Sequence, residues 1–183
     1  MVDELTLVAK LQNTSSKEIA FRDLVSQYKE RLYWHIRKIV ISHDDADDVL
    51  QNTFIKIYKS IGSFKGDSKL FSWMYRIATN EAISFINKRA KQQNVDISEY
   101  QYSLAANLTD DNWFSGEEIQ LILQKAIATL PQKQQLVFNM KYFDDMKYQD
   151  ISDILETSVG GLKASYHHAV KKIEEYIKNY SED

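Results

Sequence analysis

Apolar residues recur every three or four positions along most of this chain, which is the spacing of amphipathic α-helices. The first such run covers about residues 18–40. The second covers residues 45–61 and opens with acidic side chains, which suit the positive end of a helix dipole. The third begins after Ser68, a residue type that often caps helix N-termini, and continues to about residue 91. These runs predict a helical domain over residues 1–91.

The same spacing returns in the last third of the chain. A short run over residues 119–127 is followed by Pro131, which suits the start of the next helix. Two more runs follow, at residues 148–155 and 162–173. They predict a second helical domain over residues 118–183.

The segment between these domains, residues 92–117, has no sustained period. From Gln92 to Glu118 there are six acids and no base. We therefore expect a flexible acidic linker. With five glycines and one proline in 183 residues, the chain favours helices over strands. The predicted fold class is all-α: two small helical domains joined by a flexible linker.

The two short helices around residue 156 are separated by a three-residue polar break, which is typical of a helix-turn-helix. In that structure the start of the second helix reaches base edges in the DNA major groove. Ser158 is the expected N-cap of this helix. Gly160 and Gly161 would let its first turn approach a partner helix or a phosphate closely. An ordinary helical hairpin with a solvated polar face is the alternative.

Charge is distributed in blocks that the net charge of −3 hides. Residues 56–91 hold eight basic side chains against two acids, Asp67 and Glu81. A cluster of basic residues of this kind is typical of nucleic-acid-binding proteins. The chain has no cysteine, no apolar run of the roughly 20 residues that span a bilayer, and no basic flank typical of a secretory signal. We therefore expect a cytoplasmic protein without membrane insertion.

Enzymatic and metal-binding functions find no support in the sequence. His167 and His168 are adjacent, so on a helix they diverge and cannot chelate one ion well. The acidic cluster at residues 44–48 lacks the glycine and the terminal glutamate of a calcium-binding loop. No phosphate-binding glycine motif or nucleophile elbow is present. We expect no catalytic residue, no metal site and no cofactor.

The stretch from Leu130 to Ile173 resembles the promoter-reading C-terminal domain of bacterial RNA polymerase sigma factors of the extracytoplasmic-function group. The matching residues are Leu130, Pro131, Tyr148, Ile151, Ile154, Leu155, Ser158, Gly160 and Lys163. Glu156 stands where the family usually has glycine, and a left-handed conformation there would cost about 1–2 kcal/mol. Ser152 replaces alanine, and Ser165 and His168 stand where arginines are common.

The first half of the chain resembles the other domain of the same family. The matching residues are Asp45, Ala46, Asp48, Gln51, Phe54, Tyr58, Ser63, Phe64, Gly66, Ser68, Phe71, Trp73, Tyr75, Arg76, Ile77, Ala78 and Asn80. Ser84 stands where aspartate is usual. Two motifs in the right order and spacing identify a family more specifically than a helix-turn-helix alone. The resemblance implies a sigma factor that binds core RNA polymerase, directs it to promoters and helps to open promoter DNA.

For the first domain, the resemblance implies recognition and melting of the minus-ten promoter element, with a flipped base held near the loop at residues 63–68. A basic stripe beside aromatic residues supports this, because single-stranded bases are bound by stacking and positive charge. The candidate residues are Phe64, Lys65, Lys69, Trp73, Arg76, Ile77, Asn80, Ser84 and Lys88. The alternatives are a solvated face for the stripe and a core position for Trp73.

For the C-terminal domain, the resemblance implies recognition of the minus-35 element in duplex DNA. The candidate residues are Gly160, Gly161, Lys163, Ala164, Ser165, His167, His168 and Lys171. The resemblance also implies that this domain contacts the flap tip of the polymerase, and that the acidic linker threads toward the active-site channel.

The second predicted helix would dock on the clamp coiled coil of the polymerase, again by resemblance. Its outward residues, which would otherwise be ordinary surface, are Asp48, Gln51, Asn52, Lys56 and Lys59. An anti-sigma factor is a further expected partner, from family habit. Two other functions remain open at this stage: a helix-turn-helix regulator that works without polymerase, and a helical adaptor that binds only proteins.

Overall fold

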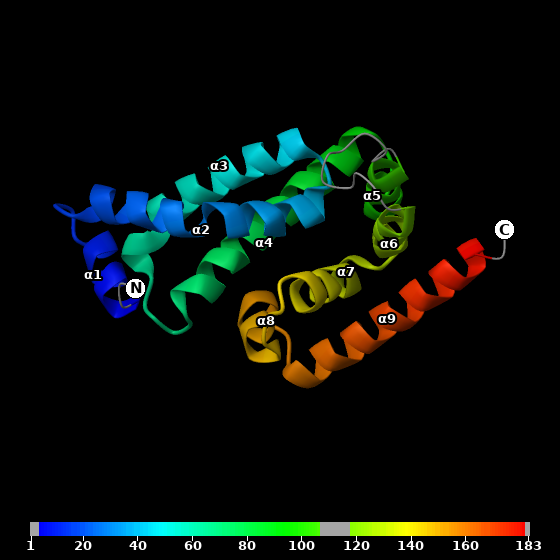
Figure 1. Ribbon diagram of the computed structural model, residues 1–183. Coiled ribbons are helices and arrows are strands. Elements are labelled where there is room, and N and C mark those ends of the chain that lie inside the picture. The colour runs from blue at the N-terminus through cyan, green and yellow to red at the C-terminus, as the bar shows by residue number, and fades with distance from the viewer. Residues whose placement is uncertain (1–3, 107–117, 182–183) are drawn as a thin grey trace.

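The computed structural model describes residues 4–106 and 118–181. Every regular element in these two ranges is a helix (Figure 1). The first half holds α1 (Glu4–Gln12), α2 (Lys17–Val40), α3 (His43–Ser60), the 3₁₀ helix η1 (Ile61–Ser63) and α4 (Leu70–Gln92). α5 (Ile97–Ala106) and α6 (Glu118–Ala128) follow, then α7 (Gln132–Phe138), the π-helix η3 (Asn139–Phe143), α8 (Tyr148–Leu155) and α9 (Val159–Ser181). The all-α prediction is confirmed.

Helices α2, α3 and α4 pack side by side, and α1 closes the end of this bundle near the N-terminus (Figure 1). Apolar positions at helical spacing bury the facing sides, among them Leu24 on α2, Ile57 on α3 and Met74 on α4, all fully buried. Burial of such side chains stabilises the bundle by about 1.5–3 kcal/mol each. The observed bounds of α2 and α3 lie close to the predicted ranges, residues 18–40 and 45–61.

The start of α4 differs from the prediction. Ser68 is not its N-cap: the helix begins at Leu70, its N-cap position is Lys69, and no side chain at that position accepts a backbone hydrogen bond. The short helix α1 was not predicted either. Its apolar residues Leu7 and Leu11 are buried, but nine residues hold too few repeats for a clear period.

A helix also lies in the segment predicted as linker. α5 buries Tyr100, Gln101 and Ala105, and it packs against α4 and α6. Gln101 donates a hydrogen bond from Nε2 to the Ile39 carbonyl at 3.2 Å and another to Gln135 Oε1 at 2.9 Å. A polar residue thus makes part of the buried contact, so the apolar pattern of this segment is too weak to predict the helix. The rest of the predicted linker, residues 107–117, lies outside the described residues.

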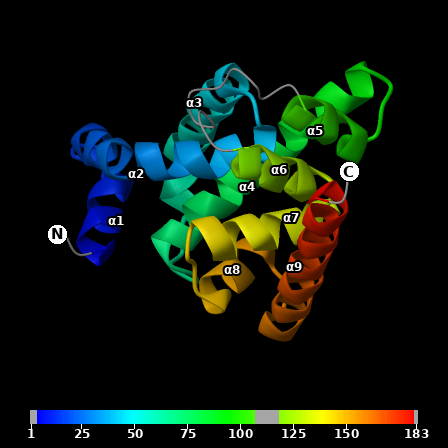
Figure 2. The ribbon, with the colours of Figure 1, turned by 45° about the vertical axis from the view of Figure 1, so that its right-hand side comes forward.

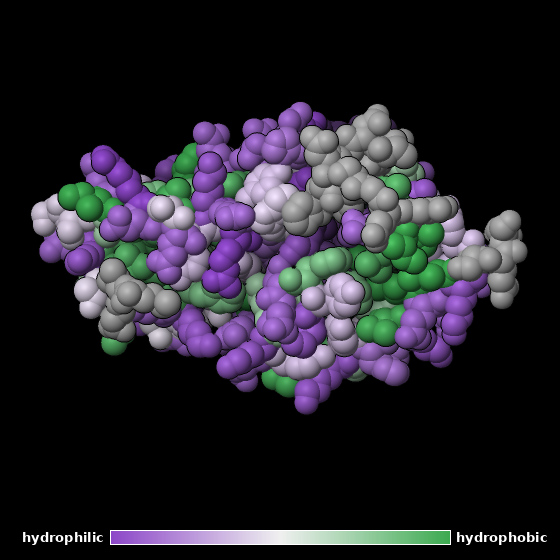
Figure 3. Space-filling view, viewed as in Figure 1, coloured by the Kyte–Doolittle hydropathy of each residue, from purple (hydrophilic) through white to green (hydrophobic). Residues whose placement is uncertain are grey.

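The C-terminal helices are held by two groups of buried residues. One joins α6, α7 and α9 through Ile127, Phe138 and Ile173. The other is continuous with the core of the N-terminal bundle and includes Ile151 and Ile154 of α8. Figure 2 shows α8 lying below α4 in the turned view. Helix α9 packs against α7. In the face shown in Figure 3, most surface residues are hydrophilic, and hydrophobic residues gather where α6 and α9 lie.

Candidate nucleic-acid interface

A cavity of about 280 Å³ lies where the loop before α4 meets the first turns of that helix. It is lined by Ser63, Phe64, Lys65, Asp67, Ser68, Trp73, Arg76 and Asp153. The rings of Phe64 and Trp73 are both half-buried, and their centroids lie 5.2 Å apart. The cavity therefore combines aromatic rings with two basic side chains, which are the features that hold an unpaired base.

The loop over this cavity takes its shape from η1 and from one glycine. Ile61 of η1 is fully buried and anchors the end of α3 in the core. Gly66 has φ of +79°, a left-handed conformation that glycine adopts at little cost. A Cβ atom at Gly66 would meet nothing within 4 Å. Backbone conformation, rather than space, therefore explains the glycine.

A polar row continues from the cavity along α4. Arg76, Asn80, Ser84 and Lys88 are spaced by four residues and so share one side of the helix. Arg76 is half-buried and the other three are exposed. Ile77 is half-buried and packs against the core. These residues beyond Arg76 do not line the cavity, so the predicted minus-ten residues divide into a pocket group and a row beside it.

The position of Trp73 combines features of the two predictions, a pocket residue and a core residue. It lines the cavity and also packs against the buried core from a half-buried site. Lys65 lies in the cavity wall. Lys69 is exposed at the start of α4, outside the lining.

The predicted helix-turn-helix is present in α8 and α9. Glu156 ends α8 with φ 52° and ψ 42°, so a glutamate occupies the left-handed turn position where the family usually has glycine. Ser158 Oγ accepts a hydrogen bond from the Gly161 backbone N–H at 3.2 Å, which confirms its capping role. The two glycines differ. A Cβ at Gly161 would lie 3.3 Å from Ser158 Oγ, whereas one at Gly160 would meet nothing within 4 Å.

The outward face of α9 is open. Most of the candidate minus-35 residues are exposed, and Gly161 and Ser165 are half-buried; the exposed ones are Gly160, Lys163, Ala164, His167, His168 and Lys171. The opposite face buries Leu162, Ala169 and Ile173 against the other helices of the domain. Neither glycine approaches a partner helix, and the space beside Gly160 in the first turn of α9 is open.

Comparison with known proteins assigns both halves of the chain. Residues 24–92 match the family model for sigma-70 region 2, and residues 120–173 match the model for sigma-70 region 4. The ECF RNA polymerase sigma-E factor of Haemophilus influenzae is 31% identical to this chain, over 97% of this chain and 98% of that protein. This chain belongs to the extracytoplasmic-function sigma factors. As a sigma factor it binds core RNA polymerase and directs it to promoter DNA.

Two solved structures share its fold. CnrH in complex with the cytosolic domain of CnrY matches with a TM-score of 0.70, at 18% identity, over 96% of this sigma factor and 97% of CnrH. The sigma factor RpoE in complex with the anti-sigma factor NepR, from Bartonella quintana, matches with a TM-score of 0.65 at 20% identity, over 86% and 96% of the two chains. Family membership excludes the regulator that works without polymerase and the adaptor that binds only proteins.

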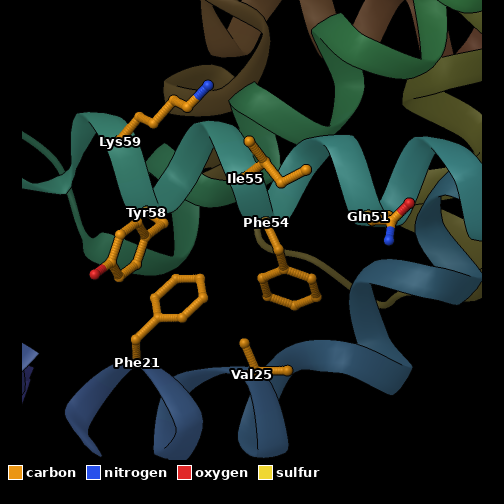
Figure 4. Close-up of a pocket in the computed structure, with 7 residues that line it drawn as sticks. All are labelled: Phe21, Val25, Gln51, Phe54, Ile55, Tyr58 and Lys59. Atoms are coloured by element: carbon orange, nitrogen blue, oxygen red, sulfur yellow. The ribbon is translucent and has the colours of Figure 1, made fainter. Parts of the chain in front are cut away.

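On the other side of the N-terminal domain, α2 and α3 of the sigma factor form an apolar groove of about 330 Å³ (Figure 4). It is lined by Phe21, Val25, Gln51, Phe54, Ile55, Tyr58 and Lys59. Phe54 and Tyr58 point from α3 toward Phe21 of α2, and the Phe21 and Tyr58 rings lie 4.9 Å apart. Sequence analysis identified Gln51 and Lys59 here and gave the apolar residues no binding role, because Phe21, Val25 and Phe54 match the pattern expected of core positions.

All five candidate polymerase-binding residues lie on the exposed side of α3: Asp48, Gln51, Asn52, Lys56 and Lys59. Lys56 pairs with Glu81 of α4. The opposite side of α3 buries Ala46, Val49 and Ile57 in the bundle.

Helix α8 of the sigma factor covers the basic start of α4. Lys69 Nζ lies 2.7 Å from Asp150 Oδ1, and this contact raises the pKa of Lys69 above its ordinary value. Arg76 donates from Nη1 to Glu156 Oε1 at 2.9 Å and from Nε to the Asp153 carbonyl at 3.1 Å. Groups of α8 and its C-terminal turn thus contact Lys69 and Arg76, two basic residues that the sequence predicted to bind DNA.

A third polar contact joins the two domains at Asp144. Lys38 of α2 forms an ion pair with Asp144 Oδ1, and His35 Nδ1 lies 3.6 Å from Oδ2. Burial raises the pKa of Asp144, but His35 and Lys38 lower it by more, so the pKa lies below its ordinary value. The carboxylate is therefore ionised at neutral pH.

Within residues 4–106 and 118–181, no cluster of three or more His, Cys, Asp or Glu side chains could hold a metal ion. In the same part of the chain, no helix is long and apolar enough to cross a membrane.

Proposed function

We propose that the cavity at the start of α4 captures a base flipped out of the minus-ten element. The observation that carries this proposal is the pairing of the Phe64 and Trp73 rings, 5.2 Å apart, beside the guanidinium of Arg76 in one cavity. The row of Asn80, Ser84 and Lys88 along α4 then follows the single strand away from the pocket. Lys65 and Lys69 at the pocket edge attract its phosphates, and Ile77 supports the helix from the core side.

Promoter opening by this pocket needs no covalent chemistry, so the chain acts by binding alone. Binding the unstacked strand more tightly than the duplex shifts the opening equilibrium by the difference in binding free energy. Stacking contributes about 1–3 kcal/mol per captured base, which is of the order needed to offset unpairing of a few base pairs.

For the minus-35 element we propose the exposed start and outward face of α9, from Gly160 to Lys171. Gly160 has open space around its Cβ position, so a phosphate can reach the backbone N–H groups of the first turn. Lys163 and Lys171 add positive charge on the exposed side, and Ser165, His167 and His168 offer hydrogen bonds to base edges. Ala164 is small and exposed, which allows close approach to the groove floor.

The exposed side of α3 is our proposed docking surface for the clamp coiled coil. Asp48, Gln51, Asn52, Lys56 and Lys59 supply its polar part, and the groove lined by Phe54 and Ile55 supplies its apolar part. A polar rim around an apolar patch is the usual composition of a protein interface. Contact of the C-terminal domain with the flap tip would place the two DNA-binding surfaces on one polymerase.

DNA binding and the contact between α4 and α8 are mutually exclusive in this proposal. The Arg76 guanidinium cannot bind Glu156 and a DNA strand at the same time, and Asp153 forms part of the pocket wall. We therefore expect α8 to leave α4 before the minus-ten element binds. Core polymerase would favour the separated state because it binds the two domains at two places.

An anti-sigma factor is a further proposed partner. RpoE of Bartonella quintana was solved with the anti-sigma factor NepR, and this chain shares its fold. Excess purified anti-sigma factor should block binding of this chain to core polymerase, and unimpaired binding would exclude that partner. The proposed site of action is the cytoplasm, where bacterial RNA polymerase works.

The first test of the whole proposal is run-off transcription on genomic DNA from the source organism. Its core polymerase is assayed with and without this chain, and the RNA 5′ ends are mapped. We expect new start sites that share two upstream motifs at a fixed spacing. No new starts, from a core that is active with another sigma factor, would contradict the proposal.

A further inference from the structure

We propose that Gln12 and Glu4 of α1 are positioning residues for the minus-ten pocket, because they hold the two ends of the loop that forms it. The inference rests on the proposed function of that pocket. Neither residue lines the cavity, and the family resemblance gave no role to this helix. Their effect on DNA would therefore pass through the backbone of residues 61–70.

Gln12 holds the first end of the loop. Its side-chain Nε2 donates to the Phe64 carbonyl at 2.8 Å and to the Ile61 carbonyl at 3.2 Å. An amide nitrogen has two N–H groups, so these two acceptors use its full donor capacity. Phe64 carries one of the two rings proposed to stack on the captured base. The hydrogen bond to its own carbonyl fixes the backbone from which that ring projects.

Glu4 holds the second end. Its Oε1 accepts a hydrogen bond from the Leu70 backbone N–H at 2.9 Å. Leu70 is the first residue of α4, and no side chain at the N-cap position Lys69 provides a hydrogen bond. A carboxylate at a helix N-terminus satisfies a free N–H and is favoured by the helix dipole. Trp73 and Arg76 follow within the first two turns, so Glu4 fixes the start of the helix that carries both.

Helix α1 carries both side chains, and two buried leucines fix its position against the bundle. Leu7 and Leu11 are buried in the core of the N-terminal bundle, 7% and 0% exposed. Glu4 and Gln12 lie eight residues apart, which separates them by about 12 Å along the helix axis. One helix, anchored in the core by these two leucines, thus spans both ends of the loop and joins them.

The experiment uses holoenzyme reconstituted from core polymerase and the full-length chain. The probe is a single-stranded oligonucleotide with the non-template minus-ten sequence of a promoter found by 5′-end mapping. An abasic site is placed at each minus-ten position in turn, and binding is measured by fluorescence anisotropy. For the parent we expect one position at which base removal weakens binding at least fivefold, the order of one lost stacking contact.

For Gln12→Ala, and more strongly for Gln12→Glu, we expect this abasic penalty to shrink by about threefold or more, at most to no penalty, as loss of one or two hydrogen bonds implies. A glutamate would place a carboxylate against two carbonyl oxygens. Glu4→Ala should act in the same direction, whereas Glu4→Gln keeps an acceptor and should retain most of the penalty. Thr6→Ala, at an exposed position on the same helix, is the matched control.

Core binding and thermal melting of each variant separate positioning from general stability. Unchanged core affinity, together with a reduced penalty and no more than the small decrease in melting temperature that one or two lost hydrogen bonds cause, would support the inference. A full abasic penalty in both Gln12→Glu and Glu4→Ala would overturn it. A reduced penalty accompanied by lost core binding would also overturn it, because the role would then be structural. If the parent shows no abasic penalty at any position, the pocket assignment itself is wrong.

Discussion

Arg76 on α4 and Glu156 at the end of α8 form an ion pair with an Nη1–Oε1 distance of 2.9 Å, and this pair joins the two DNA-binding domains. Glu156 also occupies the left-handed turn of the helix-turn-helix, where the family usually has glycine. One substitution relative to the family pattern therefore has two consequences. It strains the backbone of the turn, and it pairs a carboxylate with Arg76, a basic residue of the proposed minus-ten pocket.

Glu156→Gly should relieve the strain and release Arg76. We expect the melting temperature of the C-terminal domain to rise slightly, since a left-handed glutamate costs about 1 kcal/mol relative to glycine. We also expect the free chain to bind a single-stranded minus-ten oligonucleotide about two- to fivefold more tightly, because partly exposed ion pairs contribute at most about 1 kcal/mol. Thermal melting and anisotropy measure the two effects.

The control is Glu156→Gln, which removes the charge and keeps the strained backbone. It should raise DNA affinity without raising stability. If neither variant binds the oligonucleotide more tightly than the parent, α8 does not compete with DNA at Arg76.

Asn80→Ala should impair promoter opening and leave core binding intact. Asn80 is exposed on α4, four residues beyond Arg76, so its loss leaves the core of the bundle undisturbed. Loss of a hydrogen bond of about 1–1.5 kcal/mol implies a roughly tenfold decrease in open complex. The measurement is fluorescence of 2-aminopurine in the minus-ten element. Gln92→Ala, at the exposed end of the same helix, should open the promoter like the parent, and equal opening by Asn80→Ala would remove Asn80 from the site.

Much of the fold follows from the sequence because the long helices repeat their apolar pattern several times. α2 and α3 lie within two residues of their predicted bounds. α1 and α5 escaped prediction for a physical reason: α1 is short, and α5 is held in part by the buried amide of Gln101 rather than by an apolar stripe.

The candidate site was predictable only where residues lie close together in the chain. Phe64 and Trp73 share one loop and helix, and the family pattern names both. The contacts of Gln12 with Phe64 and of Arg76 with Glu156 join residues 52 and 80 positions apart. No local period or spacing encodes such contacts, because tertiary packing alone brings the residues together.

Lys163→Ala should weaken binding of holoenzyme to duplex minus-35 DNA and change its salt dependence. Lys163 is exposed at the start of α9, where its ammonium can reach a phosphate. Removing one phosphate contact lowers the slope of log K against log salt concentration by about one. Lys178→Ala, exposed near the other end of α9, is the control and should keep the parent slope. An unchanged slope in Lys163→Ala would place the recognition face elsewhere on the helix.

The groove between α2 and α3 gives a matched pair of isoleucines for testing polymerase docking. Ile55 borders the groove and is 45% exposed, whereas Ile19, on α2 outside the groove, is 67% exposed. Burial of an isoleucine side chain at an interface contributes about 1.5–3 kcal/mol when complete, so partial burial of Ile55 corresponds to roughly five- to tenfold in affinity. Ile55→Ser should therefore weaken core polymerase binding by this factor without lowering the melting temperature, and Ile19→Ser should leave binding unchanged. Equal affinities of the two variants, measured by titration of labelled chain with core polymerase, would mean that the groove faces solvent in the holoenzyme and that the clamp contacts only the polar side of α3.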